Sequence, residues 1–90
     1  MSHVVRERAK LLARVRRMKG QIEGVERALE GDAACGEVLR QLASIRGALT
    51  GLTKEVVEDH LHEHVLAAST KAERAEGIED VLQILGTYMK

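Results

Sequence analysis

The chain has 90 residues, with 14 basic and 14 acidic side chains, one tyrosine, and no proline, phenylalanine or tryptophan. A chain of this length forms one domain, 1–90, and buries a modest core unless it associates with further copies. Its apolar content is mainly leucine, valine, isoleucine and alanine, which is typical of an all-α bundle. The single cysteine excludes an intrachain disulfide, and the sequence has no signal peptide or long apolar run. We therefore expect a soluble, cytoplasmic, helical protein.

The first predicted helix runs from about Val4 to Glu30. Its apolar residues recur at alternating spacings of four and three, which places them in one seam along a helix. At the end of this helix, Gly31 suits the left-handed backbone position that follows many helices, and Asp32 can cap the next helix. The seam consists of Leu11, Val15, Met18, Ile22, Val25 and Leu29.

Basic residues are concentrated in the first helix. Between Met1 and Gly20 there are seven lysines and arginines, and Glu7 is the only acidic residue. Clustered charge of one sign favours a polyanion partner, whereas the alternative is an ordinary solvated helix face. Lys10, Arg14 and Arg17 share one face, and phosphate contact is a natural use for them. No helix-turn-helix or zinc-finger pattern is present.

The second predicted helix runs from Asp32 to Leu66. It carries an apolar seam with the same spacing as the first, so we expect the two long helices to pack as an antiparallel hairpin with both seams in the core. The residues of this second seam are Val38, Leu42, Ile45, Leu49, Leu52 and Val56.

A short third helix is predicted from about Gly77 to Met89, after a loop over residues 67–76. It is too short to be stable alone, so we expect it to dock on the hairpin of its own chain or of a neighbouring one. The predicted fold is therefore an all-α, three-helix protomer with two long helices and a short C-terminal one.

Chemically useful side chains lie near both ends of the second helix. Cys35 falls in the first turn, where backbone N–H groups favour a thiolate, although a small buried hydrophobe is the ordinary role of such a residue. His60 and His64 are four residues apart and share one face near the other end, whereas His62 points elsewhere. About 37 Å of straight helix separates Cys35 from His60, so one copy cannot bring them together.

A second copy can bring these residues together if its long helix lies antiparallel beside the first. Cys35 of one copy then meets the His60 and His64 face of the other, and the two-fold symmetry makes every site twice. The axis falls near Ala48, where Gly47 and Gly51 would let two backbones approach closely. Ordinary helix packing explains the same glycines equally well.

The donors in this arrangement suit a transition metal. If the initiator methionine is removed, Ser2 offers an α-amine beside His3, although a histidine in a terminal arm often has no role. A thiolate, imidazoles and an amine suit nickel, cobalt or zinc better than hard cations. The sequence shows no oxyanion loop or glycine-rich phosphate cradle, so we do not expect an enzyme.

Two stretches on either side of Cys35 resemble a known family. They are Arg14–Arg27 (RVRRMKGQIEGVER) and Gln41–Ala48 (QLASIRGA). On these residues the chain is similar to the CsoR/RcnR/FrmR family of bacterial transcriptional repressors over essentially its whole length. The resemblance implies an all-helical antiparallel dimer of hairpins that pairs into a tetramer, a dimer of dimers. It also implies a repressor that binds operator DNA without effector and releases it when an effector occupies a site shared between subunits.

The resemblance also narrows the effector. Copper-responsive members carry a second cysteine where this chain has His64, and persulfide-responsive members need two thiols, so a chain with one cysteine fits neither. Nickel- and cobalt-responsive members are similar to this chain at His3, Cys35, His60 and His64, with Ser2 supplying the amine.

The formaldehyde-responsive branch remains the alternative. There the aldehyde cross-links the residue corresponding to Cys35 with an N-terminal amine, and its familiar members have proline in place of Ser2 and an acidic residue in place of His64. An amine and a thiol are nevertheless sufficient for that chemistry. The family's DNA-binding face is matched by Arg14, Arg16, Arg17 and Lys19, with Arg46 as a further candidate.

Overall fold

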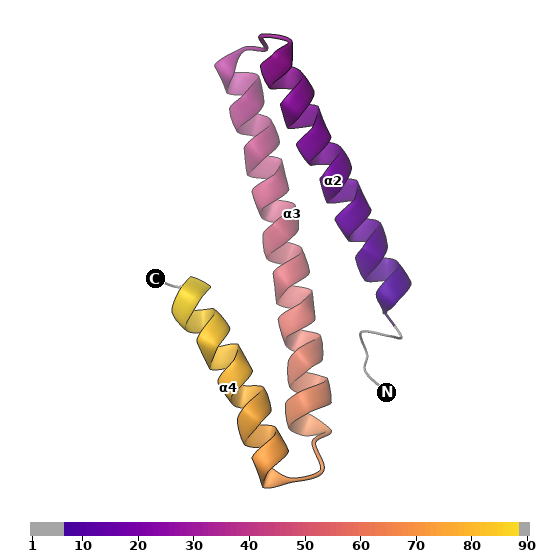
Figure 1. Cartoon of the computed structure of the whole chain (residues 1–90), viewed down its shortest axis with the longest axis vertical. Coiled ribbons are helices and arrows are strands. Elements are labelled where there is room, and N and C mark those ends of the chain that lie inside the picture. Colours follow the sequence, from indigo (N-terminus) through magenta and orange to yellow (C-terminus); the bar gives the residue numbers. More distant parts are fainter. Residues whose placement is uncertain (1–6, 89–90) are drawn as a thin grey trace. The chain divides into compact units, whose positions relative to one another are not determined.

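A computed structural model describes residues 7–88, which contain three α-helices and one π-helical segment (Figure 1). In chain order these are α2 (Arg8–Glu30), α3 (Cys35–Leu61), η1 (His62–Leu66) and α4 (Lys71–Tyr88). This part of the chain has no β-strand, so the predicted all-α, three-helix protomer is confirmed. The predicted helix ends at Val4 and Met89 lie outside the described residues. None of the helices described is long and apolar enough to cross a membrane.

The described chain divides into two compact units, Glu7–Thr53 and 54–88. In the first unit, α2 and the first part of α3 form the predicted antiparallel hairpin (Figure 1). The Gln21 side-chain amide donates a hydrogen bond of 3.3 Å to the Ser44 hydroxyl oxygen across the two helices. Further along the hairpin, the Arg14 guanidinium lies over Gly51.

The two apolar seams are only partly covered within one chain. Every seventh residue is half-buried, namely Leu11, Met18, Val25, Val38, Ile45 and Leu52. The seam residues between them remain 38–66% exposed: Val15, Ile22, Leu29, Leu42, Leu49 and Val56. The prediction that both seams form the core is therefore wrong for a single chain, in whose described residues no apolar side chain is buried. One helix can cover only one side of a seam, so the other side remains open.

The turn between α2 and α3 differs from the predicted one. Asp32, with φ 61°, occupies the left-handed position, whereas Gly31 keeps a negative φ of −91°. The Ala33 N–H donates to the Ala28 carbonyl at 2.9 Å, which is the long hydrogen bond of a Schellman motif at the end of α2. The left-handed residue of this motif is one position later than predicted. The short polar side chain of aspartate tolerates this conformation. As a result α3 begins at Cys35 and not at Asp32.

The loop predicted over residues 67–76 is also too long, because α4 begins at Lys71 and not at Gly77. The Thr70 hydroxyl accepts the Glu73 N–H at 3.1 Å, and the Glu73 carboxylate accepts the Ser69 N–H at 3.1 Å. These two hydrogen bonds resemble a capping box and cap the new helix, although the Glu73 carboxylate accepts from Ser69 and not from Thr70. The Thr-x-x-Glu spacing that produces it is visible in the sequence and was the signal for an earlier start.

The predicted helix over 32–66 changes its geometry near its end. Its last five residues form the π-helical segment η1, in which the Ala67 N–H donates to the His62 carbonyl at 3.0 Å. A π turn has one extra residue per hydrogen-bonded ring, and such turns occur often at functional sites. Here it contains His64 and leads into the short connection to α4.

The left-handed residue of the α2–α3 turn provides a test of this fold. We expect Asp32→Gly to raise the free energy of unfolding by about 0.5–1 kcal/mol, because glycine adopts a positive φ without the steric cost that an L side chain has there. Asp32→Ala should lower it, since alanine lacks the polar side chain that makes the conformation tolerable. Thermal or urea unfolding measures both. Equal stabilities for the two variants would contradict the assigned turn.

Candidate functional site

Two of the predicted ligand residues lie side by side in the unit 54–88. His60 is in the last turn of α3 and His64 is in η1, and their ring centroids are 4.7 Å apart with an interplanar angle of 40°. The His60 side chain is only 25% exposed, whereas His64 is exposed. The structure therefore confirms that these two imidazoles share one face.

His60 is held in place by α4. Its Nε2 lies 3.0 Å from the Gly77 carbonyl oxygen and 3.7 Å from an Asp80 carboxylate oxygen. A carbonyl can only accept, so Nε2 donates and carries the hydrogen of the neutral ring. The other ring nitrogen, Nδ1, then holds the lone pair that a metal ion needs. A histidine whose second nitrogen donates to a carbonyl or carboxylate has the arrangement usual for metal ligands.

The two histidines border a polar cavity of about 330 Å³ between η1 and α4. Negative charge around the cavity favours a cation over an anion. Ala67, Ala68, Ser69 and Gly77 complete the wall beside the acidic residues, which are Glu63, Glu73, Glu76 and Asp80. Sequence reasoning missed Gly77 and Asp80 because the return of α4 to His60 is a tertiary contact.

The other predicted ligands are not placed next to this pair by the described chain. Cys35 is exposed, forms no disulfide, and belongs to the unit Glu7–Thr53. Ser2 and His3 lie outside the described residues. Within residues 7–88 no group of three or more histidine, cysteine, aspartate or glutamate side chains is arranged to hold a metal ion. Two imidazoles fit a metal but do not complete a site, so further donors are required.

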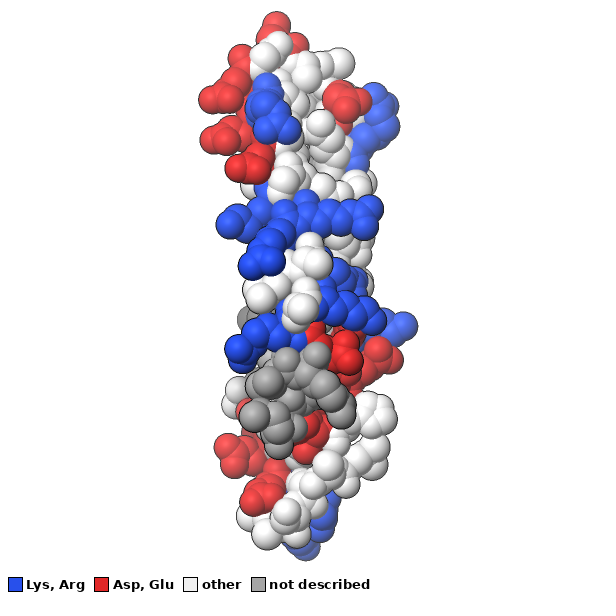
Figure 2. Space-filling model, turned by 90° about the vertical axis from the view of Figure 1, so that its right-hand side faces the viewer, with Lys and Arg blue, Asp and Glu red and all other residues white. Residues whose placement is uncertain are grey.

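The predicted DNA-binding residues lie on the hairpin. Figure 2 shows lysine and arginine side chains gathered over α2, with acidic side chains towards the α2–α3 turn. Arg14 is half-buried, and its guanidinium lies so close to α3 that a Cβ at Gly51 would be 3.0 Å from Nη2. The other four candidates are exposed: Arg16, Arg17 and Lys19 on α2, and Arg46 on α3.

A second cavity of about 240 Å³ lies between these helices. Arg14 and Arg17 border it together with Met18, Gln21, Ser44 and Ala48. The two guanidinium groups make it attractive to an anion, and the hydrogen-bonded Gln21 and Ser44 supply polar groups beside them. This polar pair could not be singled out from the sequence, because the hairpin register that brings the two residues together was not known.

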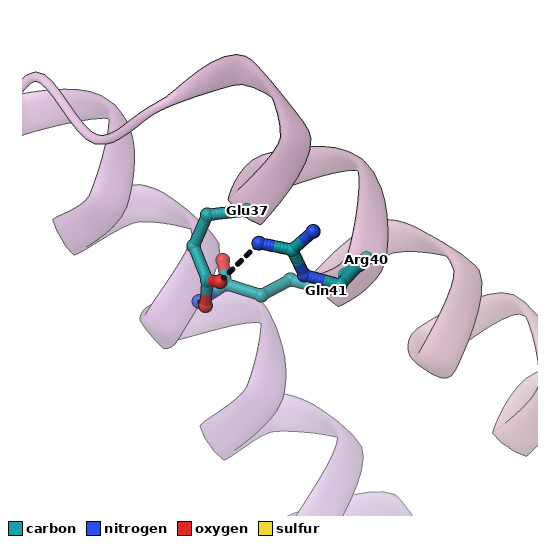
Figure 3. Close-up of polar contacts among 3 residues, drawn as sticks. All are labelled: Glu37, Arg40 and Gln41. Atoms are coloured by element: carbon teal, nitrogen blue, oxygen red, sulfur yellow. Dashed lines mark hydrogen bonds and ion pairs between the residues drawn. The ribbon is translucent and has the colours of Figure 1, made fainter.

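Arg40 forms an ion pair within its own helix. Its guanidinium lies 3.1 Å from the Glu37 carboxylate within the first turns of α3, and the Gln41 amide donates to the same carboxylate at 3.5 Å (Figure 3). The charge of Arg40 is thus compensated locally. Since this ion pair is exposed, it contributes little to stability.

Comparison with known proteins places these features in context. The sequence profile of a family described as metal-sensitive transcriptional repressors matches residues 7–87. The transcriptional repressor RcnR of Salmonella typhimurium is 40% identical over 90 residues, which cover all of both chains. A protein of Serratia marcescens, described as the uncharacterized protein in bioA 5′ region, is 50% identical over the full length of both chains.

A solved structure agrees with this relationship. A variant of the formaldehyde-responsive regulator FrmR from Salmonella enterica serovar Typhimurium superimposes with a TM-score of 0.84 at 40% sequence identity. The match covers 92% of this chain and 94% of the other.

Proposed function

The chain belongs to the CsoR/RcnR/FrmR family of metal-sensitive transcriptional repressors, which are regulators rather than enzymes, and we propose that it is a nickel- or cobalt-responsive member. In this proposal the effector-free protein binds operator DNA in the cytoplasm. Binding of nickel or cobalt at a site shared between subunits then releases the DNA. The observation that carries the proposal is the His60 and His64 pair. Because His60 Nε2 donates to the Gly77 carbonyl, the lone pair of Nδ1 is available to a metal ion.

Oligomerisation is the first requirement. A hairpin whose seam residues remain 38–66% exposed gains stability when a second copy covers them, because apolar burial is the main favourable term in association. We propose an antiparallel dimer of hairpins and a dimer of dimers. An antiparallel pair of α3 helices brings Cys35 of one copy to the His60 and His64 pair of the other.

The donor set supports the choice of metal. A cysteine thiolate, two imidazoles, His3 and the α-amine of Ser2 are enough for a six-coordinate nickel or cobalt ion when water or a further group fills the remaining position. Zinc, which prefers four ligands, needs only Cys35, His60, His64 and one more donor. We propose that this difference in coordination number, rather than the tightness of binding, separates the response to nickel or cobalt from the response to zinc.

The DNA-binding surface is the basic side of the hairpin. Arg14, Arg16, Arg17, Lys19 and Arg46 contact phosphates, and the operator is recognised largely through the shape of its grooves. Ligand binding brings Ser2 and His3 together with Cys35 and with the histidines of a second copy, which changes the spacing of these arginines between subunits. A coupling of about 1–3 kcal/mol is typical of such allosteric systems and is sufficient for release.

A response to formaldehyde is the second candidate function. It is favoured by the structural similarity to FrmR and by the exposed thiol of Cys35. The aldehyde carbon would join the thiol sulfur to the α-amine of Ser2, with loss of water. This chemistry needs neither His60 nor His64, so the two candidate functions require different residues of the chain.

Titration with cobalt(II) tests the metal site. We expect a thiolate-to-cobalt charge-transfer absorption that is absent in Cys35→Ala. His64→Ala should weaken cobalt binding by at least about 10- to 100-fold, the range found even for residues that only support a ligand. His62→Ala is the matched control, because this exposed histidine of η1 has no assigned ligand role and its loss should change nothing. An unchanged absorption in Cys35→Ala would contradict the site.

Salt-dependent DNA binding tests the basic surface. Arg14→Ala and Arg17→Ala should each weaken operator binding and reduce the log–log salt slope by about 1 for every phosphate that the variant no longer neutralises. Arg40→Ala serves as the control, since Glu37 already compensates its charge. If Arg40→Ala weakens binding as much as Arg14→Ala, the surface has been assigned wrongly.

Effector-induced release separates the two candidate functions. With the protein bound to operator DNA, we expect nickel or cobalt to cause release in the wild type and to fail in His64→Ala. Formaldehyde should have little effect on either protein. Release by low formaldehyde concentrations in both proteins, with the metals inert, would instead support the cross-linking alternative.

A further inference from the structure

Gly77 occupies an unusual position in the unit 54–88. It is the one buried residue among residues 7–87, although the other residues of its helix up to Thr87 are half-buried or exposed. A Cβ placed on Gly77 would lie 2.5 Å from the His64 carbonyl oxygen, 3.0 Å from its carbonyl carbon and 3.1 Å from its Cβ. Two of these atoms are backbone, which cannot rotate away as the end of a flexible side chain can. Even a methyl group therefore does not fit.

The same residue also contacts the second histidine of the pair. The Gly77 carbonyl oxygen accepts the hydrogen bond from His60 Nε2 at 3.0 Å. Any residue type could supply that carbonyl, but it reaches His60 only when α4 approaches η1 as closely as it does here. The close approach depends on the missing side chain.

We propose that Gly77 is a positioning residue for the His60 and His64 pair, because its lack of a side chain lets α4 close on His64 and hold His60 with Nε2 as the donor. This inference rests on the proposed function in so far as the pair binds a metal. It deepens that function by assigning the choice of the coordinating nitrogen, Nδ1 of His60, to a residue of α4. Gly77 itself touches no metal in this scheme.

Alanine substitution at two glycines of α4 tests the proposal. Gly77→Ala introduces the methyl group that does not fit, whereas Gly86→Ala introduces the same group where nothing lies within 4 Å. Both changes replace a glycine of α4 with the better helix former alanine, so a loss seen only in Gly77→Ala reports the contact with His64 and not the helix propensity. Far-UV circular dichroism checks that each full-length variant folds.

The first measurement uses metal-free protein. In the wild type and in Gly86→Ala, imidazole ¹⁵N NMR above the pH of histidine protonation should show His60 mainly as the Nε2–H tautomer. In Gly77→Ala the spectrum should shift towards a mixture of tautomers. A generally structural role for the glycine would lower stability without changing the tautomer. If Gly77→Ala does not fold, the wild-type spectrum decides, and a predominant Nδ1–H tautomer overturns the proposal.

The second measurement is cobalt(II) affinity. We expect the dissociation constant of Gly77→Ala to rise by about 10- to 100-fold, as for other residues that support a ligand, and that of Gly86→Ala to stay unchanged. If the wild type binds cobalt and Gly77→Ala has the same tautomer and the same affinity, this inference is overturned. The proposed function is then left intact. A tautomer shift in a protein that binds no cobalt would support the positioning role and contradict the proposed function.

Discussion

A two-helix hairpin can cover only one side of each apolar seam, and the rest of the structure depends on this limit. The half-buried row, such as Met18 and Ile45, packs within the hairpin, whereas the row represented by Ile22 and Leu49 remains exposed. A protein without a buried apolar side chain in its described residues has little to offset the entropy of folding alone. The partly exposed seams are therefore the observation on which the proposed association between copies rests.

The basic residues and the histidine pair lie in different parts of the chain. The basic residues of α2 and the cavity beside Arg14 belong to the unit Glu7–Thr53, whereas the histidine pair and its acidic surroundings belong to 54–88. The helix α3 contributes to both units, with Cys35 at its start and His60 near its end. A ligand that joined a thiol of one copy to imidazoles of another would therefore act on the helix that also carries Arg46. Such a connection would provide the differential contacts that allosteric coupling needs.

Among the predictions that the described residues test, those that failed concern the core and the connections between helices. The three-helix order and the shared face of His60 and His64 followed from periodicity, which depends on neighbouring residues only. The left-handed residue was assigned to Gly31 although Asp32 adopts that conformation, because several residues near a helix end can take this role. The start of α4 was placed too late because the capping pair of Thr70 and Glu73 was overlooked.

By itself, the sequence determined the helical class, the apolar seams, the concentration of arginine on α2, and a set of nitrogen and sulfur donors that suits a transition metal. These properties depend on residue type and on spacing within one helix. The tertiary structure alone decided that Gly77 meets His64, that its carbonyl accepts the hydrogen bond from His60, and that Asp80 lies nearby. The reason is physical: these contacts depend on the path of the short connection 67–70 and on the close approach of two helices, which no periodic pattern encodes.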